Sequence, residues 1–412
     1  MRRLGAIQAK NAHKTYEEGK NLTALWKTFR DLFIGAPQIN AGRTQRIPSL
    51  DGLRALSICV VLLAHSSWMI NPLVASSSVF RYVVGNGMHG VAVFFVISGY
   101  LITTLLLREV NDTGRVSLPA FYRRRTLRIF PPFYVFLIVM ALLWHFRVIT
   151  LDLQSFIAAI TYTWAINPHV GAPLLTHSWS LSIEEFFYLV WPLAFIVLHR
   201  RRKMLNYTLG MIVLFPLIRI ALYFVAHGLR GHEFYMLQGW SDTMLFGCLL
   251  AQLRARRSFE TWHNNHLKGW MVFVLAGIAF YWSKLILAHL LGHVAGFYAL
   301  AIDPTLVAIT CGAIVLYVTT RTKSLVARFL DLRLIRHIGL LSYGLYLWQQ
   351  LFMAHQFHLG GWRYVCALAA AEGSFWLVER PIMRWRRTVP RTSPTTTPLT
   401  PTSLTEPSSS TL

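Results

Sequence analysis

Cysteine is scarce in this chain of 412 residues, and no two of the four cysteines have the sequence spacing of a metal-binding motif or a disulfide framework. Cys59, Cys248, Cys311 and Cys366 stand singly inside apolar runs, without a Cys-x-x-Cys pair or a Cys/His pattern that binds zinc. This excludes a disulfide-rich secreted scaffold and gives no sign of a structural zinc site. We interpret the four thiols as packing residues.

Acidic residues are also few. The chain has 17 Asp and Glu against 40 Lys and Arg, and charged residues make up only 14% of it. Hydrophobic residues make up 54%, and mean hydropathy is +0.44. This composition excludes an ordinary soluble domain and indicates a polytopic helical membrane protein. The formal charge of +23 does not indicate nucleic-acid binding, because the basic residues cluster between apolar runs as the positive-inside rule describes.

The apolar runs predict an all-α transmembrane bundle of about ten spans. They lie at 50–68, 90–107, 130–148, 183–198, 206–227, 239–253, 269–290, 298–319, 338–358 and 362–378. Alternate threading places the basic stretches between them on one side, which we interpret as the cytoplasm, together with both termini. A further apolar stretch at 155–167 would move the basic run 199–203 outside if it crossed, so we interpret it as interfacial or re-entrant.

The two ends of the chain differ from its apolar middle. Residues 1–46 are polar and basic, without a cleavable signal peptide, and the stretch from 22 to 34 is weakly amphipathic. We expect this cytoplasmic extension to lie on anionic lipid. Residues 47–387 form the membrane domain, and the Thr/Pro/Ser-rich residues 388–412 are expected to be a disordered cytoplasmic tail. No folded domain is expected after the last span.

Arg54 and His65 are the first candidate functional residues, since both lie on the first apolar run. Eleven residues at 100° each place them on one stripe of a helix, roughly 16 Å apart along its axis. Ionisable side chains at membrane depth are costly and are functional candidates by default. Two interpretations stay open: an anchor at each interface, or a functional pair that connects two depths of the membrane.

Three other places combine polar groups with apolar runs. Ser98 interrupts bulky residues in the second span, where small residues allow close approach of a helix or a ligand. Arg124, Arg125 and Arg128, spaced i, i+1, i+4 at the start of the third span, either set topology or hold the phosphates of a donor. The adjacent Glu184 and Glu185 enter the fourth span and need partners, and one of them is suited to orient a general-base histidine such as His65.

In their order and residues, these motifs resemble the acyltransferase-3 family of bacterial membrane O-acyltransferases. The resemblance covers nearly all of residues 46–381. The residues that carry it are Asp51-Gly52-Leu53-Arg54 with His65, the run from Phe94 to Ile102, Arg124-Arg125-x-x-Arg128, Trp179-Ser180-Leu181-x-x-Glu184, the run from Ser342 to Trp348, and Glu379-Arg380-Pro381. Phe186, Trp240 and Gln349 depart from the usual pattern in regions that bear on the acceptor.

The resemblance implies transfer of an acyl group, usually acetyl from acetyl-CoA, to a hydroxyl of a glycan, glycolipid or secondary metabolite. It implies an enzyme of the bacterial inner membrane without a metal cofactor. His65 is then the catalytic histidine, with Arg54 and Glu184 as its companions. The resemblance places Ser98 and the three arginines Arg124, Arg125 and Arg128 at the donor site.

A transporter or flippase of glycans or small molecules is the main alternative. In it, Arg54, His65, Glu184 and Asp242 form a proton and substrate pathway, because relays use the same residue types. The absence of an obvious internal repeat disfavours this hypothesis. A non-catalytic scaffold is a third interpretation, which the matches at Arg54, His65 and Glu184 disfavour.

Overall fold

The computed structural model describes residues 47–66, 87–167, 170–226, 237–256, 259, 302–354, 357 and 359–388. Within these ranges the regular structure is helical, which confirms the all-α prediction for this part of the chain. The elements are α2 (Pro48–His65), α5 (Gly87–Thr113), α6 (Leu118–His145), α7 (Leu153–Ile160), η3 (Trp164–Ile166), η4 (Pro173–Leu175), α8 (Ser178–Arg200), α9 (Met204–Val225), α10 (Leu237–Arg254), α14 (Asp303–Thr320), α15 (Leu325–Leu330), α16 (Arg333–Met353), α17 (Trp362–Ser374), η8 (Phe375–Glu379) and α18 (Arg380–Thr388).

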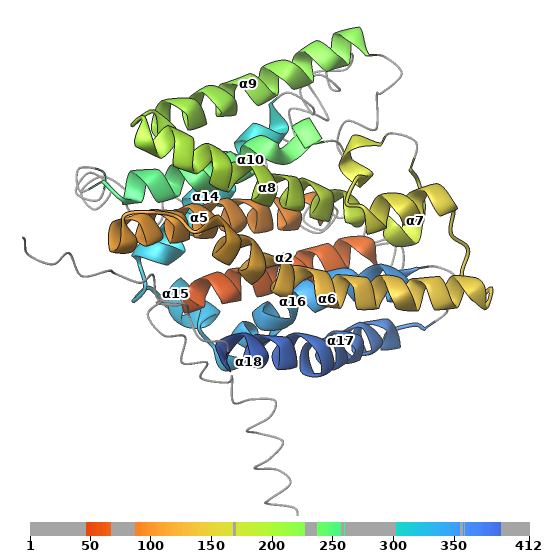
Figure 1. Cartoon of the computed structure of the whole chain (residues 1–412). Coiled ribbons are helices and arrows are strands. Elements are labelled where there is room, and N and C mark those ends of the chain that lie inside the picture. The colour runs from red at the N-terminus through yellow and green to blue at the C-terminus, as the bar shows by residue number, and fades with distance from the viewer. Residues whose placement is uncertain are drawn as a thin grey trace, which may run out of the picture.

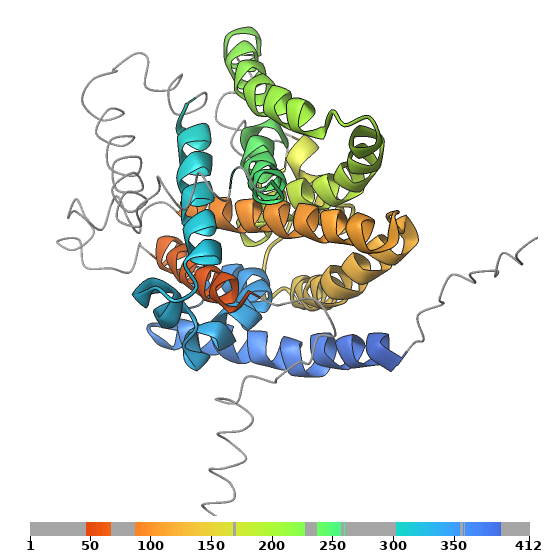
Figure 2. The ribbon, with the colours of Figure 1, turned by 90° about the vertical axis from the view of Figure 1, so that its left-hand side faces the viewer.

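The helices form a bundle in which α5 occupies a central position (Figures 1 and 2). Helix α5 packs on α10 on one side and on α2 on the other, and α2 packs in turn on α16. Helix α9 lies at one edge of the bundle against α10, while α17 and α18 lie at the opposite edge (Figure 1). The candidate residues on α2, α5, α6 and α8 therefore come from helices near the middle of the bundle.

The crossing of α5 and α10 depends on two glycines. A Cβ atom at Gly99 of α5 would lie 2.0 Å from the carbonyl oxygen of Met244, and one at Gly247 of α10 would lie 2.1 Å from that of Val96. These distances are far below van der Waals contact, so α5 and α10 touch backbone to backbone only because both positions lack a side chain. Small residues near Ser98 were predicted to permit close approach of a helix or a ligand. At the adjacent Gly99, the close approach is that of helix α10.

Six segments have the length and composition of a membrane span. They are α2, α5, α6, the segment Pro173–Arg200 that contains α8, α9 and α14. The apolar runs at 239–253, 338–358 and 362–378 also lie on helices, namely α10, α16 and α17 with its extension η8. The predicted run at 269–290, the amphipathic N-terminal stretch and the tail beyond residue 388 lie outside the described residues.

Helix α6 differs from its predicted span. It begins at Leu118 with a proline in its first turn, twelve residues before the apolar run at 130–148, and it continues through Pro131 and Pro132. Proline fits a first helical turn because its missing N–H group has no intrahelical partner there. The arginines at 124, 125 and 128 therefore lie on a helix, so adjacent arginines point in different directions.

The stretch at 155–167 does not form a helix long enough to cross a membrane. Helix α7 has only 8 residues, and the side chain of Asp152 caps it by accepting a hydrogen bond from the Ser155 N–H at 2.6 Å. The turn after α7 reaches the middle of α6, where the ring of Tyr162 stacks on Phe130 with centroids 5.4 Å apart. The Tyr134 hydroxyl donates to the carbonyl of Ile160 at 3.1 Å. This arrangement agrees with the prediction that the stretch is interfacial or re-entrant and does not cross.

Candidate active site

Glu184 of α8 connects two helices of the candidate site. Its carboxylate accepts hydrogen bonds from the hydroxyls of Ser98 on α5 and Tyr188 on α8. The two hydroxyl oxygens lie 3.3 Å from each other. Ser98 and Glu184, 86 residues apart in the sequence, are thus brought together. The contact of Tyr188 with Glu184 was not predicted from the sequence, although the i, i+4 spacing places both residues on one helix face.

Three of the predicted arginines lie close together, and two of them lie within electrostatic range of this carboxylate. Arg54 of α2 lies within electrostatic range of Arg128 and Glu184, and Arg125 lies within range of the same two residues. The Arg125 guanidinium also lies over the ring of Tyr188, 5.1 Å from its centroid. Each of the three guanidinium groups also has a further carboxylate nearby: Asp51 beside Arg54, Glu185 beside Arg125 and Glu379 beside Arg128. Guanidinium groups gathered in this way are suited to hydrogen-bond an anion such as a phosphate. We call Arg54, Arg125 and Arg128 the arginine cluster.

Arg124 is separated from the arginine cluster. Its guanidinium forms an ion pair with Glu109 of α5 at 3.1 Å, and its side chain is 44% exposed. Since neighbouring helical residues point about 100° apart, Arg124 and Arg125 cannot both face Glu184. The predicted set of three donor-binding arginines on α6 therefore divides: the structure groups Arg125 and Arg128 with Arg54 instead.

His65 is the last residue of α2, and its side chain is exposed. Its Nδ1 lies 2.8 Å from the carbonyl oxygen of Val61. A carbonyl oxygen only accepts hydrogen bonds, so Nδ1 carries the proton in this contact, and Nε2 of the neutral ring keeps its lone pair. This is the tautomer that a general base needs at Nε2.

The expected hydrogen bond from Glu184 to His65 is not among the contacts of the described residues. Glu184 lies at the depth of Arg54, whereas the residue within electrostatic range of His65 on this part of the chain is His177, just before α8. Seven residues of helix separate His177 from Glu184, about 10 Å along the axis. The Val61 carbonyl, rather than a carboxylate, fixes the His65 tautomer, and Glu184 serves the arginine cluster.

Asp242, assigned to a proton pathway in the transport hypothesis, belongs to a separate cluster. Its carboxylate pairs with Arg219 of α9 at 2.9 Å, and both side chains are fully buried. The Thr305 hydroxyl donates to the same carboxylate at 3.0 Å. This ion pair joins α9, α10 and α14. A buried charge of this kind requires its partner, so the pair has a structural explanation without a transported proton.

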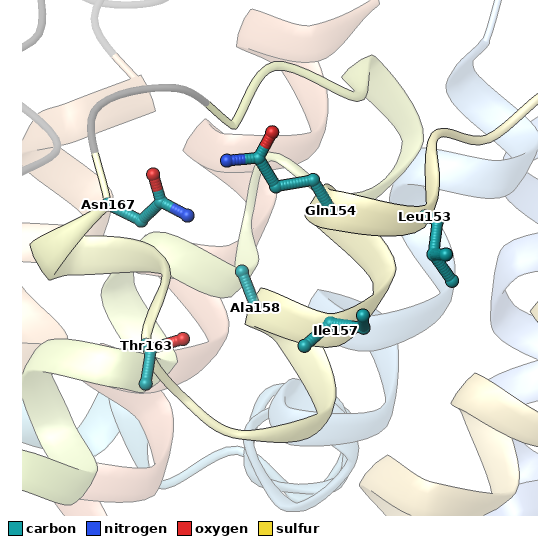
Figure 3. A pocket seen from close by; sticks show the side chains of 6 residues that line it. All are labelled: Leu153, Gln154, Ile157, Ala158, Thr163 and Asn167. Atoms are coloured by element: carbon teal, nitrogen blue, oxygen red, sulfur yellow. The ribbon is translucent and has the colours of Figure 1, made fainter.

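Two cavities flank the turn that follows α7, and Thr163 lines both. One has a volume of about 350 Å³ and lies between α7 and that turn, with Leu153, Gln154, Ile157 and Asn167 on its walls (Figure 3). It contains none of the predicted site residues. The other, of the same volume, lies between α6, the turn and α8, and Arg125 lines it. Burial raises the pKa of Tyr162, on its wall, above the ordinary value, so that phenol stays protonated.

Comparison with known proteins agrees with the motifs that meet at this site. The profile of the acyltransferase-3 family, described as an acyltransferase domain, matches residues 47–371, and this range holds Arg54, His65, Ser98, the α6 arginines and Glu184. The chain belongs to the acyltransferase-3 family. No solved structure matches it.

Several curated relatives in this family are O-acetyltransferases. The chain is 29% identical over 325 residues to the O-acetyltransferase OatA of Staphylococcus aureus, an alignment that covers 73% of this chain and 50% of OatA. It is 27% identical over 370 residues to the peptidoglycan O-acetyltransferase OatA of Listeria monocytogenes, covering 82% of this chain and 56% of that protein. A putative O-acetyltransferase of S. aureus is 34% identical over 227 residues, which is 50% of this chain and 35% of the relative. The chain thus spans about half the length of the two OatA relatives and about a third of the other protein.

Proposed function

We propose that this acyltransferase-3 protein transfers an acetyl group from acetyl-CoA to a hydroxyl of a cell-envelope glycan. The observation that carries the proposal is the α2 helix, which holds on one stripe an arginine of the arginine cluster and a histidine whose Nδ1 donates to the Val61 carbonyl, so that Nε2 carries the lone pair. At 1.5 Å per residue the two are roughly 16 Å apart along the axis. The glycan acceptor is suggested by the relative that acts on peptidoglycan.

The proposed topology has ten spans in the bacterial inner membrane, with both termini in the cytoplasm. The basic start of α6 then lies on the cytoplasmic side, where acetyl-CoA is made, and His65 lies toward the external side. The arginine cluster binds the phosphates of CoA, and Ser98, Glu184 and Tyr188 hold its guanidinium groups in place. The acetyl thioester extends from this cluster toward His65.

In the transfer step, Nε2 of His65 accepts the proton of the acceptor hydroxyl as its oxygen attacks the thioester carbonyl. A carbon–oxygen bond forms, the carbon–sulfur bond breaks, and the proton passes from the imidazolium to the departing CoA thiolate. A two-step route, in which Nε2 first takes the acetyl group and then yields it to the hydroxyl, uses the same nitrogen. Both routes need the tautomer that Val61 fixes.

Acetyl transfer by the purified protein tests the proposal. The full chain in nanodiscs is incubated with labelled acetyl-CoA and either tetrameric N-acetylglucosamine or peptidoglycan fragments, and label in the glycan is followed by mass spectrometry. We expect transfer by the wild type and at least about a hundredfold loss in His65→Gln. Full activity in a folded His65→Gln protein would refute the role of His65.

The transport hypothesis predicts a different result in the same experiment. A transporter needs no acyl donor, so it would leave acetyl-CoA unconsumed while glycan crossed the membrane. The pairing of Asp242 with Arg219, in a cluster separate from Glu184, disfavours a relay that joins the two carboxylates. Consumption of acetyl-CoA coupled to glycan modification would exclude transport as the main activity.

A further inference from the structure

The cavity between α6, the turn after α7 and α8 is not used by the mechanism above. It has a volume of about 350 Å³, within the range of small-ligand sites. Aromatic and aliphatic side chains such as Phe130 and Leu189 form much of its wall, and Tyr162 closes it on the side of the re-entrant turn. The polar groups that enter it come from three separate elements.

Two of these polar groups have no hydrogen-bond partner among the described residues. They are one carboxylate oxygen of Glu185 and the hydroxyl of Tyr162, both buried atoms on the cavity wall. Buried polar atoms are normally paired, because leaving them unpaired costs free energy. Glu185 projects about 100° away from Glu184, so it faces this cavity and not Ser98. The cavity thus offers an acceptor and a donor to a ligand.

The position of Arg125 connects the cavity with the arginine cluster. Arg125 lines the cavity and also lies within electrostatic range of Arg128 and Glu184. A ligand that places phosphates on the cluster can therefore extend an uncharged arm past Arg125. The aromatic wall suits a slender apolar chain, while Glu185 and Tyr162 suit amide groups along it.

We propose that this cavity holds the pantetheine arm of the acyl donor, an inference that rests on the proposed function. Glu185 accepts a hydrogen bond from an amide N–H or hydroxyl of the arm, and the Tyr162 hydroxyl donates to an amide carbonyl. The arginine cluster holds the phosphates at the other end of the same molecule. Glu185 and Tyr162 are donor-binding residues in this arrangement and take no part in bond making.

Binding of two thioesters to the full chain in nanodiscs tests this proposal. Acetyl-CoA carries the phosphates, whereas acetyl-pantetheine has the same arm without the nucleotide, and both are measured in labelled form by equilibrium dialysis without an acceptor. Tyr162→Phe removes one hydrogen bond, Glu185→Gln weakens one by removing the charge of the acceptor, and both change little volume. We expect each to weaken both thioesters by about three- to tenfold. Arg128→Gln should weaken acetyl-CoA alone.

Two further variants test whether a change in thioester affinity comes from the cavity itself. Tyr207→Phe, at an exposed position of α9, is the matched control and should leave both affinities unchanged. Thr126→Trp places bulk at an exposed position on the cavity wall, and we expect it to exclude acetyl-pantetheine without loss of folding. Unchanged thioester binding in Tyr162→Phe, Glu185→Gln and Thr126→Trp would overturn the proposal.

The competing occupant is a sugar of the acceptor. If tetrameric N-acetylglucosamine displaces acetyl-pantetheine from the wild type, and the cavity variants weaken the sugar alone, the cavity belongs to the acceptor and the proposal is wrong. If the wild type binds no acetyl-CoA at all, the proposed function itself fails. Wild-type binding that the cavity variants do not change would refute only the assignment of the cavity.

Discussion

The division of the α6 arginines gives the sharpest test of the site. Arg124 and Arg128 lie one helical turn apart, and the sequence pattern treats them alike, but only Arg128 lies within electrostatic range of Arg54. If Arg128 donates a charge-assisted hydrogen bond to a CoA phosphate, its loss costs about 1.5–3 kcal/mol. Arg128→Gln should therefore weaken acetyl-CoA binding about 10- to 150-fold. Arg124→Gln should change it by less than about twofold, since that guanidinium is paired with Glu109.

The same pair of variants has different expected effects on the ligand-free protein. Arg128→Gln removes repulsion from Arg54 and Arg125 but also attraction to Glu379, so the unfolding temperature should change little. Arg124→Gln removes an exposed ion pair, worth about 0.2–1 kcal/mol, and should lower it slightly. Both quantities are measured on the purified full chain in nanodiscs, by equilibrium dialysis with labelled acetyl-CoA and by thermal unfolding without ligand.

Salt provides a control within this experiment. Since the contacts of Arg128 with phosphate are electrostatic and this residue is exposed, raising the ionic strength should reduce the difference between the wild type and Arg128→Gln. Equal losses of acetyl-CoA affinity in Arg124→Gln and Arg128→Gln would refute the assignment, because they would mean that the helix face does not decide which arginine binds the donor.

Three other outcomes follow from particular contacts. Tyr188→Phe removes one of the two hydroxyls on the site carboxylate while it keeps the ring, and should lower stability by about 1.5–3 kcal/mol in thermal unfolding; an unchanged unfolding temperature would contradict the hydrogen bond. Gly247→Ala should destabilise by about 1–3 kcal/mol through its clash with α5, while Gly210→Ala, with open space around it, should be neutral or stabilising; equal effects would contradict the close crossing. Asp242→Asn leaves a buried arginine without its counter-charge and should cost about 3–5 kcal/mol, seen as loss of folded protein, and normal folding would contradict a structural ion pair.

The positions of the helices follow from the local sequence, whereas the contacts between helices depend on the tertiary structure. The apolar runs predicted helices correctly wherever the structure describes them, because a membrane requires about 20 apolar residues in a helix that satisfies its own backbone. The extension of α6 to Leu118 was missed, since a hydropathy pattern does not register a helix that continues into a basic segment. The charge of 199–203 indicated that the stretch at 155–167 does not cross the membrane, and the short α7 agrees with this.

Side-chain contacts between different helices were not predictable from the sequence, for a physical reason. Periodicity tells which residues share a helix face but not which face of another helix it meets. Glu184 was expected to hold His65, and instead it accepts from Ser98 and Tyr188 near Arg54. The buried residue within electrostatic range of His65 is His177, and no sequence spacing indicated this proximity.

The sequence by itself determined the membrane bundle, the common stripe of Arg54 and His65, and the family of the protein, because these depend on composition, helical rise and residue order. Only the tertiary structure decided which arginines form a cluster and that Glu185 and Tyr162 face a cavity. Those facts depend on how α5, α6 and α8 rotate against one another, and contacts between distant residues, such as the hydrogen bond from Ser98 to Glu184, hold that rotation.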